Sequence, residues 1–492
     1  MLTLCENYNE NIKRIDRTLR VDESFDLIKK TLWIAEREFT LYYIDGFVEG
    51  NSMNKLMTYF LGIQTIAYPE NAGGEETARY FLQHHLPHVE AELTETGDTM
   101  MQMVLSGTSL LIGEGFGRYA IVLDSRTYPT RSVGEPDNDR VMVGSRDGFV
   151  ETLVFNTALI RRRVRDPELT MKYFTIGNRS RSDVVLCYLN GQADPKYVKY
   201  LEQKLSNIKT GALTMAHESL AELLIDRRWY NPFPKIRYTE RPDVAAAQVL
   251  EGSVLIVCDN TPEVMILPST IFDFMQESND YYFPPLIGTY IRIVRHIVFW
   301  ATLLLIPTWF LLTKHPGITP AWLQFILPES TGKVPIFAQL LLVEFMIDGL
   351  RMASMNTPDM LSNSLSVVGG LILGDFAVSI GWLIPEVIVY MAFVSIANFT
   401  QRSYELGYAF KFMRIGLIIL IQLFNYIGFV VGLLLCLILL LTNKTANRNR
   451  SYLYPLIPFN GKALLALFVR PRKDRYPDSI GVRVEDDGEK DS

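Results

Sequence analysis

The sequence has little of what builds disulfide frameworks and metal centres. Its 492 residues include four cysteines, none of them in a C-x-x-C pair, and six histidines. Cysteines scattered in this way support neither a disulfide-stabilised fold nor a zinc site. The first thirty residues also lack the apolar run that defines a signal peptide. We therefore expect the N-terminal half to lie in the cytoplasm, a reducing compartment.

An excess of basic residues is missing as well. The formal net charge is −6 and the isoelectric point is about 5.7, whereas proteins that bind nucleic acid usually carry a clear positive excess. Nucleic acid is therefore not an expected partner. The P-loop, G-x-S-x-G and H-E-x-x-H motifs are absent too, which removes common signatures of nucleotide and hydrolase chemistry.

One glycine-rich run is similar to a dinucleotide-binding fingerprint. The run is Gly113 to Gly117 (GEGFG), but its third glycine is misplaced. A strand rather than a helix is expected after it, so no helix N-terminus is available to bind a pyrophosphate. We interpret this run as a turn.

One histidine cluster is a candidate metal site. It consists of His84, His85 and His88 with Glu90, and His84 and His88 have the i, i+4 spacing of helical metal ligands. Pro87 breaks that helix, so an exposed helix end is favoured over a metal site. We expect no metal, no cofactor and no enzyme activity, and an enzyme acting through this cluster is the least favoured hypothesis.

The apolar residues are distributed unevenly along the chain. They make up 48% of the sequence, and charged residues make up 21%. Mixed sequence extends to about Tyr282, whereas apolar runs dominate from Pro284 to Leu441. We therefore expect an α/β soluble half followed by an all-α polytopic membrane domain. The expected domains are an α/β lobe at 1–135, a second α/β lobe at 136–285, a transmembrane domain at 286–445 and a cytoplasmic C-terminal tail at 446–492.

Local patterns in the soluble half predict helices at 24–33, 53–60 and 149–164 and a strand at 39–44. The last of these helices ends in a basic cluster, Arg161, Arg162, Arg163 and Arg165. Such a cluster contributes about 1 kcal/mol per basic residue when it faces anionic lipid headgroups. A solvated helix end, stabilised by the helix dipole, is the favoured alternative.

The soluble half also contains a similarity of pattern about 145 residues apart. FTLYYIDGFVEGNSMNKLMTYFL at 39–61 aligns with VVLCYLNGQADPKYVKYLEQKLS at 184–206, so that Tyr43 matches Tyr188. A second pair of strands, at 118–129 and 253–264, is separated by about 135 residues, and both strands end in aspartate. We interpret these pairs as a duplicated α/β unit, which predicts two similar lobes. The alternative is the strand, turn and helix pattern that any two α/β domains share.

The membrane half contains four long apolar segments, at 297–312, 334–350, 365–399 and 415–441. The third is interrupted by Asp375, Gly381, Pro385 and Glu386, so a broken or re-entrant helix followed by a crossing is expected there. The fourth has 27 residues without a formal charge, more than a bilayer core of about 30 Å requires. We expect it to be one span that is tilted or has an interfacial portion.

Basic residues flank the membrane half on both sides. Arg292 and Arg295 precede its first apolar segment, and a basic tail follows Leu441. The positive-inside rule places both flanks in the cytoplasm, which requires an even number of crossings. We expect about four spans plus a re-entrant or broken segment; whether 365–399 crosses once or twice is left open.

Charged residues inside membrane segments cost about 2.5 to 3.5 kcal/mol each at a helix centre and usually have a function. The expected intramembrane charge network is Glu344, Asp348, Arg351, Glu386 and Arg414. Its acids are candidates for a cation path. Alternatively, Glu344 and Asp348 pair with Arg351 or Arg414 merely to hold the helices together.

The segment from Ser364 to Asp375 is the candidate pore. Glycines four residues apart allow helices to approach closely, a ring of carboxylates favours cations, and apolar side chains close a pore by dewetting. The alternative is an ordinary close-packed helix pair. The candidate pore or gate residues are Val367, Val368, Gly370, Leu371, Gly374 and Asp375.

Several runs, in order, resemble the A-subunit family of bacterial spore germination receptors. They are RSVGEPDNDRVMVGSRDGFVETLVFNTALIRRRV at 131–164, NPFPKIRYTERPD at 231–243, SNDYYFPP at 278–285, VVGGLILGDFAV at 367–378 and SYLYPLIPF at 451–459. The resemblance implies a multi-pass protein of the spore inner membrane, with its N-terminal domains in the spore core, that acts during germination. It also implies a homo-oligomeric ring, of five subunits as one option, around a path for monovalent cations.

The same resemblance implies partners, namely another small membrane subunit or germination receptor proteins. The sequence departs from the receptor pattern at 352–361, where MASMNTPDML stands in place of a proline-bearing turn. Coupling to a nutrient through that loop is therefore not expected to carry over. The functional hypothesis is an ion channel or ion-release subunit, and the alternative is a non-conducting scaffold that organises germination receptor or solute-release proteins.

Overall fold

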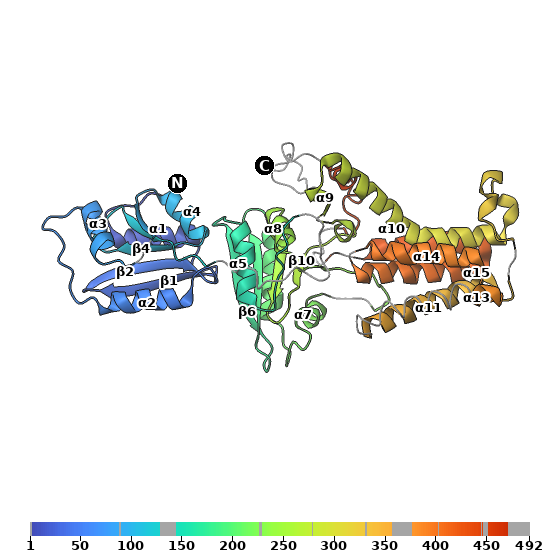
Figure 1. Ribbon diagram of the computed structural model, residues 1–492, viewed down its shortest axis with the longest axis horizontal. Coiled ribbons are helices and arrows are strands. Elements are labelled where there is room, and N and C mark those ends of the chain that lie inside the picture. Colours follow the sequence, from blue (N-terminus) through green and yellow to red (C-terminus); the bar gives the residue numbers. More distant parts are fainter. Residues whose placement is uncertain are drawn as a thin grey trace. The chain divides into compact units, whose positions relative to one another are not determined.

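The computed structural model describes residues 2–87, 90–127, 144–225, 229–277, 279–329, 332–356, 376–401, 403–443, 445 and 451–470. The chain forms two compact units (Figure 1). The first contains Met1–Asp226 and Ile236–Pro268, and the second contains Arg227–Lys235 and Ser269–Arg472.

The first unit consists of two lobes, each built around a five-stranded antiparallel sheet with helices packed on it (Figure 1). Lobe 1 contains α1 (Tyr8–Leu19), β1 (Leu27–Ile34), β2 (Arg37–Ile44), α2 (Gly50–Gly62), α3 (Gly74–His84), β3 (Ala91–Thr94), α4 (Gly97–Leu105), β4 (Ser109–Gly113) and β5 (Ala120–Leu123). Lobe 2 contains α5 (Leu153–Arg163), β6 (Leu169–Ile176), β7 (Ser182–Leu189), α6 (Pro195–Ser206), α7 (Ala216–Leu224), β8 (Arg237–Thr239), α8 (Pro242–Leu250), β9 (Val254–Cys258) and β10 (Val264–Leu267).

The two sheets have the same topology. Their strand orders are β1-β2-β4-β5-β3 and β6-β7-β9-β10-β8. Five pairs of elements begin 145 residues apart: α1 and α5 (8 to 153), β2 and β7 (37 to 182), α2 and α6 (50 to 195), α4 and α8 (97 to 242), and β4 and β9 (109 to 254). The lobes are therefore two copies of one α/β unit.

A buried asparagine repeats with the same spacing and the same hydrogen bonds. Asn11 accepts from the backbone N–H of Cys5 and donates to its carbonyl oxygen, both at 2.7 Å. Asn156, which lies 145 residues later, accepts from Val150 at 2.8 Å and donates to it at 2.5 Å. Each asparagine thus satisfies one backbone N–H group and one carbonyl oxygen of the segment that enters its lobe, as buried polar groups require.

The structure corrects two sequence-based expectations in the lobes. Residues 24–33 are not a helix, because β1 pairs with β2 along its whole length, from Leu27 opposite Ile44 to Ile34 opposite Arg37. The strands 118–129 and 253–264 are not equivalent either. β5 corresponds in the sheet to β10, and β9 corresponds to β4, so the true spacing is about 145 residues throughout. The shared aspartate after β5 and β9 caused that error.

The second unit is helical. It contains η1 (Asp273–Met275), α9 (Asn279–Tyr282), α10 (Pro285–Lys314), η2 (Pro316–Ile318), η3 (Ala321–Ile326), α11 (Ile336–Asn356), α13 (Ala377–Ser379), α14 (Pro385–Phe399), α15 (Tyr404–Thr442) and α16 (Gly461–Phe468). Within the described residues, α10 and α15 are long and apolar enough to cross a membrane, and α14 is a shorter apolar helix. Four spans are thus not confirmed.

The longest helix, α15, is folded back on itself at Asn425, whose φ of 53° and ψ of −123° are not helical. A Cβ atom placed on Gly428 would lie 1.9 Å from the carbonyl oxygen of Leu420, and one on Gly432 would lie 2.5 Å from the Leu417 side chain. In a straight helix residues 420 and 428 would be about 12 Å apart. The expectation of a single span at 415–441 is therefore wrong, and residues 404–424 and 426–442 form two antiparallel arms.

This hairpin predicts a sharp difference between two glycines of α15. We expect Gly428→Ala to destabilise the protein by about 1–3 kcal/mol or more, since the new methyl group has no room against Leu420. Gly416 faces open space, so Gly416→Ala is expected to be neutral or stabilising by a few tenths of a kcal/mol. The fraction of detergent-solubilised protein that survives heating as a monodisperse species measures both. Equal behaviour of the two variants would contradict the hairpin.

Two contacts show that α10 runs parallel to the first arm of α15. Near one end, the rings of Phe299 and Phe410 lie 4.3 Å apart. Near the other end, the Lys314 ammonium donates to the carbonyl oxygens of Ile421 at 3.3 Å and Gln422 at 3.1 Å. The start of α10 and both ends of the α15 hairpin therefore lie at the same end of the helical unit.

The C-terminal segment packs at that end as well. Arg292 donates to the carbonyl oxygen of Ala466 at 2.8 Å, and the backbone N–H of Arg470 donates to Thr289 at 3.1 Å. We call this end, where Arg292, Arg295 and Arg470 lie, the basic end. Arg470 of the C-terminal tail is thus brought close to the arginines that precede the first apolar segment.

Two contacts show that α11 and α14 run parallel to each other. The side chain of Gln339 accepts from the backbone N–H of Ile384 at 2.9 Å near their starts. The Arg351 guanidinium lies 5.1 Å from the centre of the Phe399 ring near their ends. The connection between these helices includes residues 357–375, which lie outside the described residues.

Candidate functional site

The main polar feature of the helical unit is a buried carboxylate, Glu344, in the middle of α11. Only 4% of this residue is exposed. The Arg414 guanidinium, from the first arm of α15, donates to it at 2.7 Å, and the Lys411 ammonium lies 3.2 Å away. Arg414 also donates to the backbone carbonyl of Thr302 on α10 at 2.6 Å. One arginine therefore joins three helices.

A second carboxylate completes the cluster. Asp348 lies one turn after Glu344 on α11 and forms an ion pair with Lys411. About a third of its side chain is exposed, whereas the side chain of Arg414 is buried. We call Glu344, Asp348, Lys411 and Arg414 the charge cluster. Its two negative and two positive charges balance, which offsets much of the cost of burying them.

The structure places the other expected network residues elsewhere. The Arg351 guanidinium lies over the rings of Phe399 and Tyr408, at 5.1 and 5.6 Å, an arrangement that favours a cation. Glu386 lies in the first turn of α14, where the helix dipole favours a negative charge. The six pore or gate candidates, Val367 to Asp375, lie outside the described residues.

Sequence reasoning missed Lys411. The available signal was spacing, because Glu344 and Asp348 are four residues apart on one helix, and Lys411 and Arg414 are three residues apart on another. Residues with these separations share a helix face. Two acids on one face of an apolar helix and two bases on one face of another would have predicted that these four residues form ion pairs.

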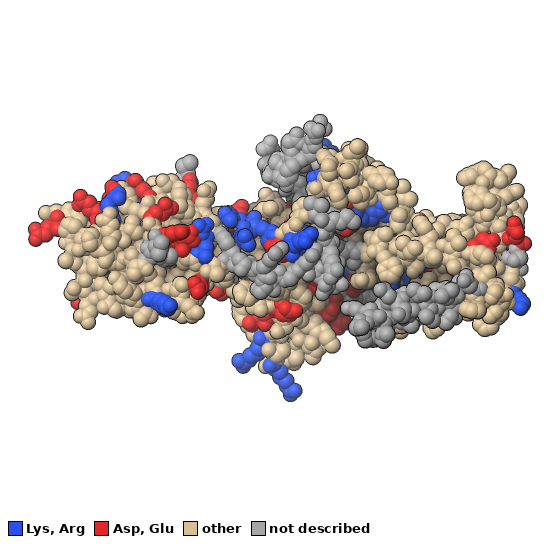
Figure 2. All heavy atoms as spheres, viewed as in Figure 1, with Lys and Arg blue, Asp and Glu red and all other residues tan. Residues whose placement is uncertain are grey.

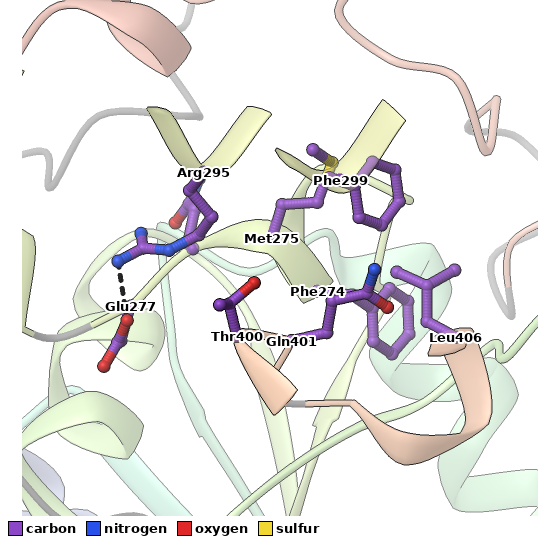
Figure 3. A pocket seen from close by; sticks show the side chains of 9 residues that line it. Phe274, Met275, Glu277, Arg295, Phe299, Thr400, Gln401 and Leu406 are labelled. Carbon is purple, nitrogen blue, oxygen red and sulfur yellow. Dashed lines mark hydrogen bonds and ion pairs between the residues drawn. The ribbon is translucent and has the colours of Figure 1, made fainter. Parts of the chain in front are cut away.

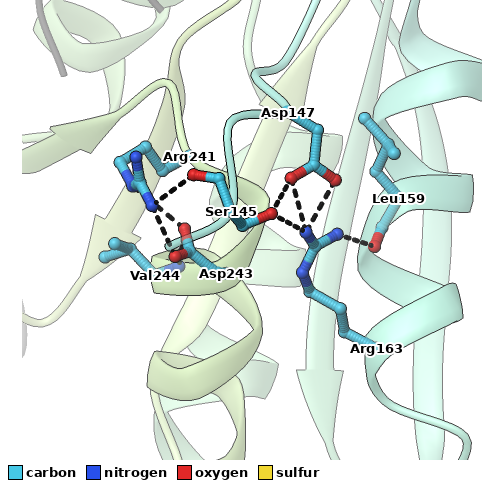
Figure 4. Close-up of polar contacts among 7 residues, drawn as sticks. All are labelled: Ser145, Asp147, Leu159, Arg163, Arg241, Asp243 and Val244. Carbon is cyan, nitrogen blue, oxygen red and sulfur yellow. Dashed lines mark hydrogen bonds and ion pairs between the residues drawn. The ribbon is translucent and has the colours of Figure 1, made fainter. Parts of the chain in front are cut away.

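A second polar cluster lies in lobe 2 (Figure 4). Arg163 donates to the Asp147 carboxylate at 2.6 and 2.8 Å. The buried Arg241 donates to Asp243 at 2.6 Å and to the carbonyl oxygen of Ser145 at 3.0 Å. The sequence runs 131–164 and 231–243 thus meet at this point. Their polar residues hold the chain that enters lobe 2.

The acid–base balance of this cluster favours an ionised Asp147. Burial by itself raises the pKa of its carboxyl group, but hydrogen bonds from Arg163 and Ser145 outweigh burial and hold the pKa below its usual value. The folded state gains stability from this interaction above the unfolded pKa, and loses it as the pH falls through the lower folded pKa. The Arg163 guanidinium therefore forms its ion pair within lobe 2 and does not face lipid.

Arg161 is fully buried and joins the two lobes. Its guanidinium donates to Asp26 of lobe 1 at 2.7 and 3.1 Å and to the carbonyl oxygen of Leu169 at 2.9 Å. Ser24 donates to the same aspartate at 2.7 Å. Neither a lipid-facing nor a solvated helix end describes this residue, so both interpretations of the basic cluster are wrong for it.

The remaining candidates from the sequence, the glycine run and His84 of the histidine cluster, lie in a turn and at a helix end. The glycine run is the turn between β4 and β5, with φ angles of 93° at Gly115 and 62° at Gly117. His84 ends α3 with its ring stacked on Tyr80 at 4.3 Å, and His88 lies outside the described residues. The described residues contain no group of three potential metal ligands.

A small pocket lies at the basic end of the helical unit (Figure 3). Arg295 closes one side of it, paired with Glu277 at 2.6 Å. Apolar side chains, among them Phe274, Met275 and Phe299, form much of the rest. Since Arg295 and Glu277 already pair with each other, we interpret the pocket as a packing site between these segments, stabilised by one ion pair.

Comparison with known proteins identifies the family. The family model described as Bacillus/Clostridium GerA spore germination protein matches residues 13–476. Since that range covers most of the chain, the chain belongs to the GerA family of spore germination proteins, as its sequence runs predicted.

Among individual relatives, the chain is 38% identical over 472 residues to Stage V sporulation protein AF of Bacillus subtilis, covering 96% of this chain and 94% of that protein. The sequence runs quoted above predicted a resemblance to this paralogue, and the comparison confirms it. The chain is also 27% identical to Spore germination protein KA of the same organism, covering 94% of this chain and 84% of that protein.

One solved structure is similar to the N-terminal half. It is the crystal structure of the N-terminal domain of the A subunit of the Bacillus megaterium spore germinant receptor GerK3, with 24% identity and a TM-score of 0.40. The match covers 54% of this chain and 96% of that one.

Proposed function

We propose that this chain is a subunit of an oligomeric ion-release complex in the spore inner membrane that promotes germination. The charge cluster is the observation that carries the proposal. Four ionisable side chains lie between apolar helices. Apolar residues of similar size often stabilise a protein as well as a buried ion pair does, so stability alone does not explain these charges. Charges kept inside membrane segments usually serve an ion path or a switch.

The exposure of Asp348 supports the same function. Glu344 and Arg414 are enclosed, but Asp348 keeps about a third of its side chain accessible. A carboxylate that is partly accessible and linked to a buried cluster can exchange its partner Lys411 for a mobile cation. Lys411 would then pair with Glu344 alone, from which it already lies 3.2 Å away.

Residues 364–375 are the proposed pore-lining segment, with copies of Asp375 forming a carboxylate ring in a homo-oligomer. Figure 2 shows many charged side chains on the first unit, whereas the described surface of α10 and its neighbours on this face carries few. Such a surface suits contact with lipid or with other copies of the chain.

The alternative function is a non-conducting scaffold for other germination proteins. The observation that favours it is the balance of the charge cluster, since each acid already has a cationic partner. A cluster of this kind can hold three helices together without carrying any ion.

Cation efflux from liposomes that contain the purified protein separates the two functions. We expect Val367→Ala to raise the basal leak several-fold, because a narrower side chain weakens an apolar gate, and Asp375→Asn to reduce the preference for potassium over chloride. Membrane insertion should be unchanged in both. Gly416→Ala is the matched control, since Gly416 faces open space. Efflux no greater than that of protein-free liposomes would favour the scaffold, whereas efflux that matches a conducting parent in both variants would show that residues 364–375 are not the pore.

A further inference from the structure

Residues 229–235 belong to the helical unit, although along the chain they lie between α7 and β8 of lobe 2. Asn231 donates to the backbone carbonyl of Leu439 at 3.1 Å. The ring of Phe233 packs edge-on against Phe410, with the ring centres 6.1 Å apart. Leu439 lies in the last turn of α15, so these two contacts hold the segment beside the basic end of the second arm.

Two large aromatic side chains in this segment are exposed. Trp229 is 95% exposed and Tyr230 is 48% exposed. Their rings are perpendicular, with centres 6.1 Å apart. A tryptophan ring left in water forgoes the hydrophobic free energy that its burial would contribute. An exposed pair on an anchored segment therefore indicates an apolar or interfacial neighbour.

The surroundings of the pair are apolar as well. The second arm exposes Ile438 and Leu441 within one turn of Leu439, and the C-terminal segment exposes Ile457 and Phe459. That C-terminal segment is joined to residues 229–235 through Tyr452, whose ring centre lies 6.4 Å from that of Phe233. The aromatic pair thus continues the exposed surface of a candidate membrane span.

We propose that Trp229 and Tyr230 lie in the interfacial layer of the lipid bilayer and hold this loop against the membrane surface. Tryptophan and tyrosine favour that layer because the ring enters the edge of the acyl region while its N–H or O–H group reaches water and headgroups. The basic end also carries Arg292 and Arg295, as expected for a cytoplasmic membrane surface. This inference rests on the proposed function, in which α10 and α15 cross the membrane.

A spin label at position 229 tests the inference in the full chain. The background is Cys5→Ser, in which the remaining cysteines are buried. Burial raises the pKa of Cys187 and of Cys258 to about 12, so those thiols stay protonated and unreactive. Labels are placed by Trp229→Cys, by Trp33→Cys on the exposed part of β1, and by Val430→Cys on the exposed face of the second arm.

The readout is the collision rate of each label with oxygen, which concentrates in lipid, and with a water-soluble nickel complex. In vesicles of phosphatidylcholine and phosphatidylglycerol, we expect the oxygen-to-nickel ratio at position 229 to be several-fold higher than at 33 and lower than at 430. A ratio at 229 equal to that at 33 overturns the inference. Protection at 229 from both reagents also overturns it, because another protein copy then covers the site. A water-like ratio at 430 overturns the membrane placement itself.

Discussion

Replacing Asp26 with alanine is expected to lower the free energy of unfolding of the N-terminal lobes by about 3–5 kcal/mol. The change removes the carboxylate that neutralises Arg161, whose side chain has no exposure to water. An unpaired buried guanidinium cannot recover its hydration, and the two lobes lose their buried ion pair. Thermal unfolding of the full chain, followed by circular dichroism, should shift down by roughly 10 °C.

Two further variants separate the charge effect from simple loss of contact. In Asp26→Ala/Arg161→Met no charge is left buried, so we expect this double variant to be more stable than Asp26→Ala alone. Arg20 forms another ion pair between the lobes, with Glu168, but it is partly exposed. Arg20→Met is therefore expected to cost at most about 1 kcal/mol. Equal losses for Arg20→Met and Asp26→Ala would refute the special role of the buried pair.

Replacing Arg414 with methionine is expected to have the largest effect in the helical unit. Glu344 and Asp348 would then share Lys411, which leaves one uncompensated negative charge among apolar helices. The carbonyl oxygen of Thr302 would also lose its donor. We expect a loss of about 3–5 kcal/mol, measured as the decrease in the temperature at which detergent-solubilised protein aggregates.

The double variant Glu344→Met/Arg414→Met is the matched control. It removes one complete ion pair and leaves Lys411 paired with Asp348. We therefore expect it to retain more stability than Arg414→Met alone, despite the second substitution. If the double variant were the less stable of the two, the cluster would depend on individual hydrogen bonds rather than on charge balance.

The tandem repeat shows how far local sequence pattern extends. The strand, turn and helix at 37–62 and 182–206 share hydrophobic spacing and a glycine with positive φ, Gly46 and Gly191. The hydrophobic spacing and the shared glycine were sufficient to predict that these two segments are equivalent. β1 was misread as a helix because its apolar residues also fit helical spacing, and its partner strand decides between the two.

The sequence by itself determined the division into a mixed-polarity half and an apolar half, the family, and the positions of the buried acids. These features depend on composition and on residue type at each position. Only the tertiary structure decided which strands are equivalent, that α15 turns back at Asn425, and that Glu344 pairs with Arg414 and Lys411. A hydropathy profile does not show where an apolar segment reverses direction, so it could not predict the turn at Asn425. The partner of a charged side chain depends on which helices pack together, and a local sequence pattern does not contain that information.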